Sequence, residues 1–400
     1  MMPSLRSLAS VAFRIVIAGA CCLGVWYSLE LGRADSLFRE DTEESVRSAI
    51  RLVPDGWQYY MRLAQFDSQH ARELLATALD INRFNAQGDI ELGLRDEADG
   101  DLNSAEKRLL AAFEVDQTYL PRSSLANFYF RHENLPEFWK WARSAAEMPS
   151  DDIGPLLELC WRVSPDPEKI TAAILNDKPE LIRQYLEFLL AKNQLHAVAA
   201  VAVRLAHSGD PDSDRTQLFS VVNRLVTAGD TEAAIALWHL MIDQHWIVAD
   251  YTVPNNANFV RKPLPVTFDW SLPEYPGLNS WPGSSGLAIE FSGSEPEDCT
   301  IAEQALALSP GNYTMTYAYR TTDIPPATGI RWQIVDSRSN NILVDSPDLS
   351  SDELENSTLA FAVPSGSSFL RLRLGYRRVL GTPRISGTLV VLSTQIEAHV

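Results

Sequence analysis

The sequence has little positive charge, few histidines and few cysteines. Lysine and arginine number 34 against 52 aspartates and glutamates, which gives a formal net charge of −18. Nucleic-acid binding relies on a basic face that neutralises phosphates. The acidic balance therefore argues against a nucleic-acid partner, and we predict none.

Local signatures of catalysis are also absent from the sequence. It contains no glycine-rich phosphate loop, no Gly-x-Ser-x-Gly elbow and no histidine pair four residues apart. His239 and His245, with Asp243 between them, would project from different faces of a helix and would be poor ligands for one metal ion. We therefore predict no catalytic residue, cofactor or metal, and we expect no enzyme. Two facing carboxylates would suffice for a glycosidase, and that alternative stays open.

The four cysteines do not form a disulfide framework. Cys21 and Cys22 are adjacent in the N-terminal apolar stretch, whereas Cys160 and Cys299 belong to different predicted domains. We expect the last two to be buried free thiols.

One cluster of arginines near the C-terminus runs against the acidic balance. Its members are Arg371, Arg373, Arg377, Arg378 and Arg384. Side chains alternate along a strand, so Arg371 and Arg373 would share one face while the leucines between them take the other. We interpret the cluster as the solvated face of a strand, with a basic binding patch as the alternative.

The N-terminal segment 1–35 carries the longest apolar run. The run from Ile15 to Leu29 is uncharged, Arg14 precedes it and acidic residues follow from Glu30 onward. This pattern predicts a signal anchor with one transmembrane helix at about 11–31. The positive-inside rule would then place the C-terminal domains outside the cytoplasm, in the periplasm if the protein is bacterial.

Two alternatives for the N-terminus stay open. The first is a cleaved signal peptide, for which Ala18-Gly19-Ala20 supplies small residues. The second is lipid attachment at Cys21. Each of them delivers the following domains to the same side of the membrane.

Residues 36–250 show alanine- and leucine-rich runs at helical spacing, broken by short polar turns. The stretch Asp89 to Gly93, the turn at Gly100, and Ala105, Leu109 and Ala112 resemble a tetratricopeptide repeat (TPR). Small residues at Gly93 and Ala105 would let two helices approach closely. The resemblance implies a helical solenoid whose concave face binds a protein partner.

A preceding unit supports the repeat. Ala71, Leu75 and Ala78 lie one family period, about 34 residues, before the matching positions of the next unit. In a later unit, Trp139 and Trp141 cannot both face inward because they are two apart on a helix. Trp139 is therefore a candidate ligand contact.

Residues 251–400 begin with a proline-rich stretch and continue as short apolar or alternating runs separated by turn signals. The predicted strands are 287–291, 313–319, 330–335, 342–344, 358–363, 369–374 and 387–392. Short strands at such spacing predict an antiparallel β-sandwich. The fold class is thus a multidomain α-then-β chain, with a TPR-like α-solenoid before a jelly-roll-like sandwich.

The sandwich resembles jelly-roll carbohydrate-binding modules and galactose-binding-like domains. The residues that carry this resemblance are Asn258-Phe259, Phe268-Asp269-Trp270 and Gly311-Asn312-Tyr313. The resemblance implies glycan recognition by aromatic platforms, with Trp270, Trp281 and Trp332 as candidates. Trp281 lies in a sequence typical of a loop, which favours its exposure, whereas a core position is the favoured interpretation of the other two.

The function expected from this layout is a membrane-anchored, non-catalytic scaffold. Its helical array would dock a protein and its sandwich would bind a polysaccharide or a second protein. The layout resembles bacterial envelope proteins associated with exopolysaccharide assembly or export. The alternatives are a glycan-processing enzyme and a purely structural assembly factor that binds no glycan.

Overall fold

The computed structural model describes residues 5–148, 152–175, 178–366 and 369–399; for residues 5–13, 15 and 16 only the backbone is described. The chain divides into two compact units, Met1–Asn176 and Asp177–Val400. The helices are α1 (Leu5–Arg39), α2 (Glu43–Leu52), α3 (Trp57–Phe66), α4 (Ala71–Ile81), α5 (Ala86–Ala98), α6 (Leu102–Val115), α7 (Tyr119–Arg131), α8 (Leu135–Ala146), α9 (Gly154–Val163), α10 (Pro167–Ile174), α11 (Pro179–Ala191), α12 (Leu195–Ser208), α13 (Pro211–Ala228) and α14 (Thr231–Asp243). The strands, all in the second unit, are β1 (Leu278–Gly283), β2 (Gly286–Ser292), β3 (Asp298–Leu306), β4 (Gly311–Thr322), β5 (Ile330–Asp336), β6 (Ile342–Asp345), β7 (Glu355–Val363), β8 (Leu370–Arg377) and β9 (Ser386–Ala398).

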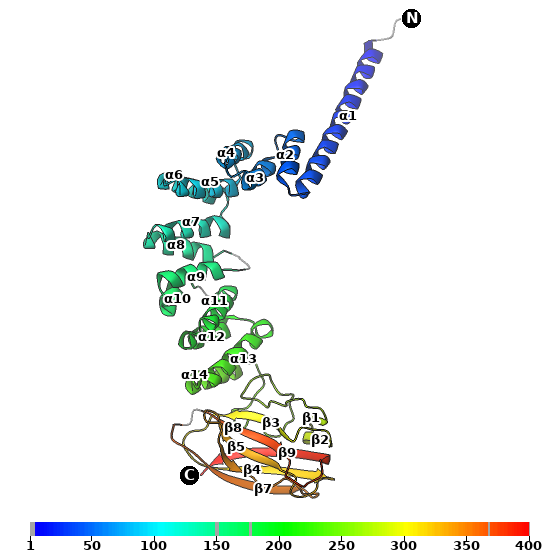
Figure 1. Ribbon diagram of the computed structural model, residues 1–400, viewed down its shortest axis with the longest axis vertical. Coiled ribbons are helices and arrows are strands. Elements are labelled where there is room, and N and C mark those ends of the chain that lie inside the picture. Colours follow the sequence, from blue (N-terminus) through cyan, green and yellow to red (C-terminus); the bar gives the residue numbers. More distant parts are fainter. Residues whose placement is uncertain (1–4, 149–151, 176–177, 367–368, 400) are drawn as a thin grey trace. The chain divides into compact units, whose positions relative to one another are not determined.

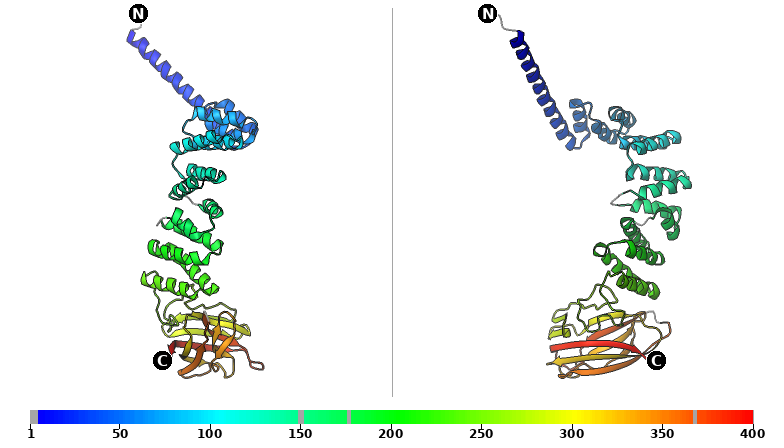
Figure 2. Two further views of the ribbon diagram at one scale, coloured as in Figure 1. Left: turned by 90° about the vertical axis from the view of Figure 1, so that its left-hand side faces the viewer. Right: turned by 180° about the vertical axis from the view of Figure 1, so that it is seen from behind.

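The helices of the first unit pack mainly in consecutive pairs, from α1 with α2 to α7 with α8 (Figures 1 and 2). The end of α1 belongs to the first pair, because Ala34 is fully buried in one core with Val46 and Ala49. The array therefore begins inside the helix that also contains the N-terminal apolar run.

The repeat read from the sequence forms α5 and α6. A Cβ atom on Gly93 would lie 3.3 Å from the carbonyl oxygen of Ala105, so the absence of a side chain permits this close approach. Gly100 makes the turn between the helices with φ of +87°, a conformation that favours glycine. Leu109 and Ala112 are fully buried. The predicted packing of this helix pair is confirmed.

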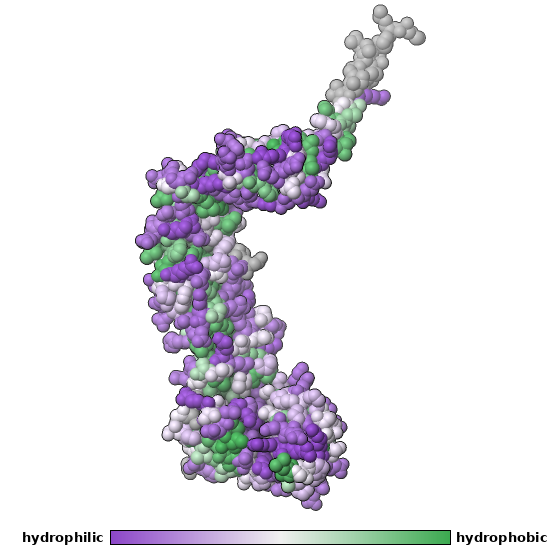
Figure 3. Space-filling model, viewed as in Figure 1, coloured by the Kyte–Doolittle hydropathy of each residue, from purple (hydrophilic) through white to green (hydrophobic). Residues whose placement is uncertain are grey.

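The predicted transmembrane helix at about 11–31 is not found. Helix α1 covers this stretch, but no helix in the part of the chain that the structure describes is long and apolar enough to cross a membrane. Part of the predicted span, the side chains of residues 11–13, 15 and 16, lies outside what the structure describes. Figure 3 shows hydrophobic residues on the described part of α1, and Leu23 and Trp26 are among those exposed.

The sandwich in the second unit consists of two antiparallel sheets that lie face to face (Figures 1 and 2). One has the strand order β1-β2-β9-β4-β7 and the other β3-β8-β5-β6. Alternate side chains of both sheets, such as Ile289, Leu389 and Leu372, form one buried core. The remaining side chains of each strand face outward, so each sheet presents one outer face.

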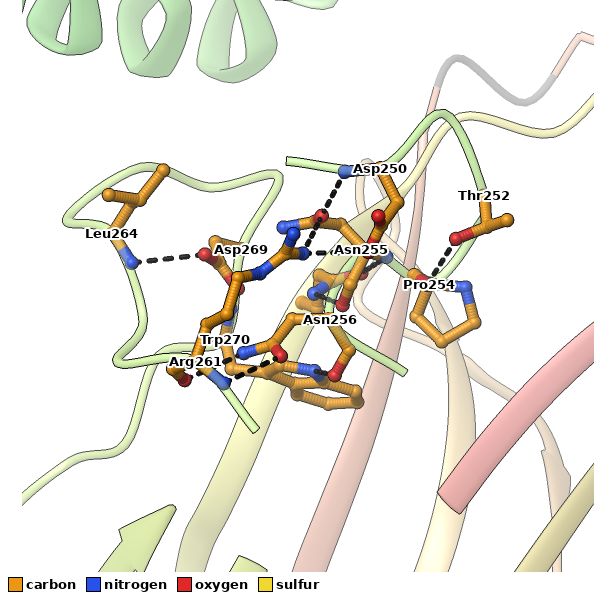
Figure 4. Close-up of polar contacts among 10 residues, drawn as sticks. Asp250, Thr252, Pro254, Asn255, Asn256, Arg261, Leu264, Asp269 and Trp270 are labelled. Carbon is orange, nitrogen blue, oxygen red and sulfur yellow. Dashed lines mark hydrogen bonds and ion pairs between the residues drawn. The ribbon is translucent and has the colours of Figure 1, made fainter. Parts of the chain in front are cut away.

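The segment before β1 is fastened to the sandwich by buried hydrogen bonds (Figure 4). The backbone N–H of Asn255 donates to Oε1 of Gln304 at 2.8 Å, and Nε2 of Gln304 donates to the carbonyl of Asn255 at 3.0 Å. The indole N–H of Trp270 donates to the carbonyl of Asn256 at 3.2 Å, and Asp269 accepts from the N–H of Trp270 at 2.8 Å. Asp269 and Trp270, two residues on which the resemblance rests, thus stabilise the position of this segment on the sandwich.

Helices α13 and α14 contact the same segment. Oδ1 of Asn223 accepts a hydrogen bond from the backbone N–H of Thr267 at 2.8 Å. The rings of Trp238 and Phe268 lie 5.9 Å apart. These contacts explain why the last helices of the array belong to the same compact unit as the sandwich.

Candidate functional site

Two of the tryptophans proposed as ligand platforms lie inside the sandwich. Trp270 is 1% exposed and Trp332 is 0% exposed, and their ring centroids are 6.0 Å apart. A ligand cannot stack on a ring that is enclosed on both faces. Both are core residues, and their nomination as ligand contacts is corrected.

Trp139 and Trp141 point to different sides of α8. Trp141 is buried and packs edge-on against Phe113, with 4.9 Å between ring centroids. Trp139 is half-buried, beside Phe138 and with Nζ of Lys169 5.9 Å from its ring centroid. Trp139 is thus the more accessible of the two, and its contact with a ligand stays a prediction.

Trp281 is the exposed member of the candidate set, with 47% of its surface accessible. It lies in strand β1 at the edge of the five-stranded sheet, not in a loop as its sequence context indicated. The strand register places it beside Ala288 of β2, followed by Val390 of β9 and Arg320 of β4. The small side chain of Ala288 leaves room next to the indole.

The neighbouring row on the same outer face is polar. Asn279 of β1 pairs with Glu290 of β2, and the row continues through Thr388 of β9 to Thr322 of β4. Asn279, Glu290 and Thr322 are exposed. A flat apolar ring beside an amide, a carboxylate and hydroxyls can hold a ligand whose one side is apolar and whose edge carries hydroxyl groups. We call this surface, Trp281 with Asn279 and Glu290, the Trp281 face.

The outer face of the four-stranded sheet carries a second polar row. The register aligns Glu303 of β3, Arg373 of β8, Gln333 of β5 and Asp345 of β6. Nε of Arg373 donates to Glu303 at 2.8 Å, and Nε2 of Gln333 donates to Asp345 at 2.9 Å. Sequence reasoning recognised the arginine but missed its partners, which come from strands distant along the chain.

The arginine cluster of the sequence faces outward with carboxylates beside it. Arg371 and Arg373 both pair with Glu303, and Arg378 pairs with Glu297 at 2.7 Å. Asp298 lies 3.9 Å from Arg377. These pairs offset part of the positive charge, as expected for the solvated face of a strand.

The first unit has a shallow pocket of about 490 Å³ at α2, α3 and α4. Its apolar lining comes from Ile50, Tyr60 and Leu74, and its charged lining from Glu44, Arg47 and Arg51. Arg47 is paired with Glu43 and Asp67, whereas the hydrogen bond of Arg51 goes to the hydroxyl of Ser48 at 2.7 Å. The pocket can accept an apolar side chain next to a negative charge.

The titratable groups in the cores have pKa values set mainly by burial. Burial raises the pKa of the Cys160 thiol to about 12 and that of Cys299 to about 11, so both thiols stay protonated at neutral pH. Both cysteines are free, as expected. Burial also raises the pKa of Asp269, against backbone hydrogen bonds that lower it. In the described ranges, no group of three or more His, Cys, Asp or Glu residues could hold a metal ion.

Comparison with known proteins shows no family for this chain. No protein-family model matches it, and no curated protein matches it. Solved structures with similar folds include TPR proteins and carbohydrate-binding modules.

Three of these structures illustrate the likeness. YrrB, a TPR protein with an unusual peptide-binding site, is 13% identical over 51% of this chain and 93% of its own, with a TM-score of 0.25. CBM4 is 14% identical over 36% of this chain and 99% of its own, with a TM-score of 0.29. The N-terminal cellulose-binding domain of Cellulomonas fimi β-1,4-glucanase C is 15% identical over 33% and 89%, with a TM-score of 0.23.

Proposed function

We propose that this protein is a non-catalytic scaffold whose helical array docks a protein partner and whose sandwich binds a glycan on the Trp281 face. The observation that carries the glycan part is the exposed indole of Trp281 on an outer sheet face, with Glu290 and Asn279 in the neighbouring row. The C–H face of a sugar ring can stack on the indole while its hydroxyls bond to the carboxylate and the amide.

The protein-docking part is supported by the pocket at α2, α3 and α4. Its apolar lining and the exposed Arg51 fit an apolar side chain that is followed or preceded by an acidic residue. A scaffold of this kind would suit the assembly of an exopolysaccharide or of another part of a bacterial envelope. Its location outside the cytoplasm stays a prediction.

The glycan part is tested by Trp281→Ala in the full chain. A glycan-array screen of the wild type identifies a ligand, and isothermal titration then measures its affinity. We expect the alanine variant to bind about fivefold more weakly, because loss of ring stacking costs on the order of 1 kcal/mol. Trp281→Tyr, which keeps an aromatic ring, should retain most of the affinity.

Leu380→Ala is the matched control, because it also removes an exposed apolar side chain, one that is 100% accessible. Equal affinity of Trp281→Ala and Leu380→Ala would contradict the role of the Trp281 face. Absence of binding to every glycan would favour the structural assembly factor. Turnover of the bound glycan would favour the glycan-processing enzyme.

The docking part is tested by Arg51→Glu. Reversing the charge at the edge of the pocket should reduce the recovery of a bound partner at least tenfold, in a quantitative co-purification from the source cells. Arg83→Glu makes the same charge change at an exposed position in the turn between α4 and α5, and it should leave recovery unchanged. Equal recovery of the partner with Arg51→Glu and Arg83→Glu would contradict docking at this pocket.

A further inference from the structure

A hollow of about 380 Å³ opens on the outer face of the four-stranded sheet. It is lined by Thr300 of β3, Arg331 and Gln333 of β5, and Arg373 and Gly375 of β8, among others. Gly375 has no side chain, and a Cβ atom there would lie 3.3 Å from Oε1 of Gln333 and 3.8 Å from Cδ of Arg373. The hollow therefore has a polar lining in which the amide of Gln333 lies against the backbone of Gly375.

Two arginines flank Gly375. Arg331 is its register partner on β5, and Arg373 precedes it by two residues on the same face of β8. Arg331 and Arg373 are thus diagonal neighbours, whose backbones lie about 7–8 Å apart. The side chain of Gln333, the register partner of Arg373, reaches over Gly375 between the two arginines.

Both arginines are anchored by a carboxylate at one edge only. Nε of Arg331 donates to Asp348, and Nε of Arg373 donates to Glu303 at 2.8 Å. Within the described part of the chain, the terminal Nη1 and Nη2 groups of both arginines make no hydrogen bond. Anchoring at Nε fixes the plane of each guanidinium and leaves its two amino groups for a ligand.

We infer that this hollow binds the carboxylate of an acidic sugar, such as a uronic acid in an oligosaccharide. A guanidinium presents parallel N–H donors that match the two oxygens of a carboxylate. Gln333, Thr300 and Asp345 offer an amide, a hydroxyl and a carboxylate for the hydroxyl groups of the sugar. The inference rests on the proposed glycan-binding function and adds a second site with a different preference.

A sugar fits the hollow better than an acidic peptide does. The lining is mainly polar, with the aliphatic side chains of Ile342 and Val379 at its border. A peptide would need apolar anchors and a path for its backbone, whereas a sugar presents hydroxyls around its ring. The formal charge of −18 on the whole chain also disfavours a long polyanion, so a short oligosaccharide or a chain end is the expected occupant.

The test compares tri-galacturonate with its methyl ester by titration against the full chain. The ester lacks the negative charge of each carboxylate and carries a methyl group in its place. We expect the acid to bind at least tenfold more tightly than the ester. Arg331→Gln and Arg373→Gln should each weaken binding of the acid at least tenfold, whereas Trp281→Ala should leave it unchanged. Arg320→Gln, a matched loss of one arginine from the other sheet, should also leave it unchanged.

Hydrogen-exchange protection of β8 checks that Arg331→Gln and Arg373→Gln still fold. A conservative variant, Arg373→Lys, retains the positive charge but not the planar guanidinium. It should restore only part of the affinity, because an ammonium cannot make the bidentate contact. Equal binding of acid and ester would overturn the inference, as would loss of binding in Trp281→Ala. Tight binding of hexaglutamate with the same arginine dependence would assign the hollow to an acidic peptide instead.

These outcomes separate the two proposals. Binding of a neutral glycan that depends on Trp281, without binding of tri-galacturonate, would leave the proposed function in place and remove the second site. Binding of tri-galacturonate that depends on Arg331 and Arg373 but not on Trp281 would establish the second site even if the Trp281 face binds nothing.

Discussion

Replacing Trp332 with alanine is expected to lower the free energy of unfolding of the sandwich by about 3–5 kcal/mol. Trp332 is fully buried between the two sheets, with its ring centroid 6.0 Å from that of Trp270 and 6.4 Å from that of Tyr317. Alanine would leave a cavity that the surrounding core cannot fill by small shifts. Hydrogen exchange of the β5 and β8 amides in the full chain measures the change.

Trp332→Phe separates the loss of volume from the loss of the indole N–H. Nε1 of Trp332 is buried and has no hydrogen-bond partner among the described residues. Burying such a group costs about 1–3 kcal/mol, and phenylalanine removes it. We therefore expect Trp332→Phe to be only about 1–2 kcal/mol less stable than the wild type. Equal losses for alanine and phenylalanine would show that the indole N–H has a partner after all.

Trp281→Ala is the surface counterpart of this experiment. The side chain of Trp281 is exposed at a sheet edge, so its removal should change the free energy of unfolding by no more than about 0.5 kcal/mol. The contrast between the two tryptophans illustrates what sequence alone leaves undecided. Both occur near turn-forming residues, but strand register turns one toward the core and the other toward solvent.

The sequence predicted seven of the strands that the structure describes, because they are short apolar or alternating runs separated by turn signals. It missed β1 and β3. Strand β1 contains the sequence Asn279-Ser-Trp-Pro-Gly283, which is typical of a loop, and its proline is tolerated because β1 lies at the edge of the sheet. Strand β3 carries Glu303 and Gln304 in succession, and Gln304 is buried because it bonds to the backbone of Asn255.

The hollow on the four-stranded sheet could not be predicted from local pattern. Alternation predicted correctly that Arg371 and Arg373 share one face of a strand. It did not reveal that β8 lies between β3 and β5, which supply Glu303 and Arg331. Such a site depends on strand order, and strand order is a long-range property of the fold.

The helical repeats were more predictable because helix pairs are local. Gly93, Ala105 and Leu109 fulfil the packing roles expected of them within one pair. At the N-terminus the local pattern predicted a membrane-spanning helix, which the described residues do not show. The apolar run belongs to a helix whose end packs in the array through Ala34, and no described helix meets the length and apolarity of a membrane span.

The second large effect is expected for Gly329→Ala at the start of β5. Gly329 has a φ of +92°, and an added Cβ atom would lie 1.9 Å from the carbonyl oxygen of Arg377. That approach is fixed because the N–H of Arg377 donates to the carbonyl of Gly329 at 3.0 Å. Alanine must therefore separate β5 from the end of β8, and we expect a loss of about 3 kcal/mol or more.

Gly381→Ala is the control that separates steric clash from backbone strain. Gly381 has a similar φ of +89°, but an added Cβ atom would meet nothing within 4 Å. Its substitution should cost only the left-handed backbone penalty, about 1–2 kcal/mol. Hydrogen exchange of β5 and β8 in both variants gives the comparison. If the two losses were equal, the contact between Gly329 and Arg377 would not hold these strands together, and the hollow that Arg331 and Arg373 line would lack its support at this end.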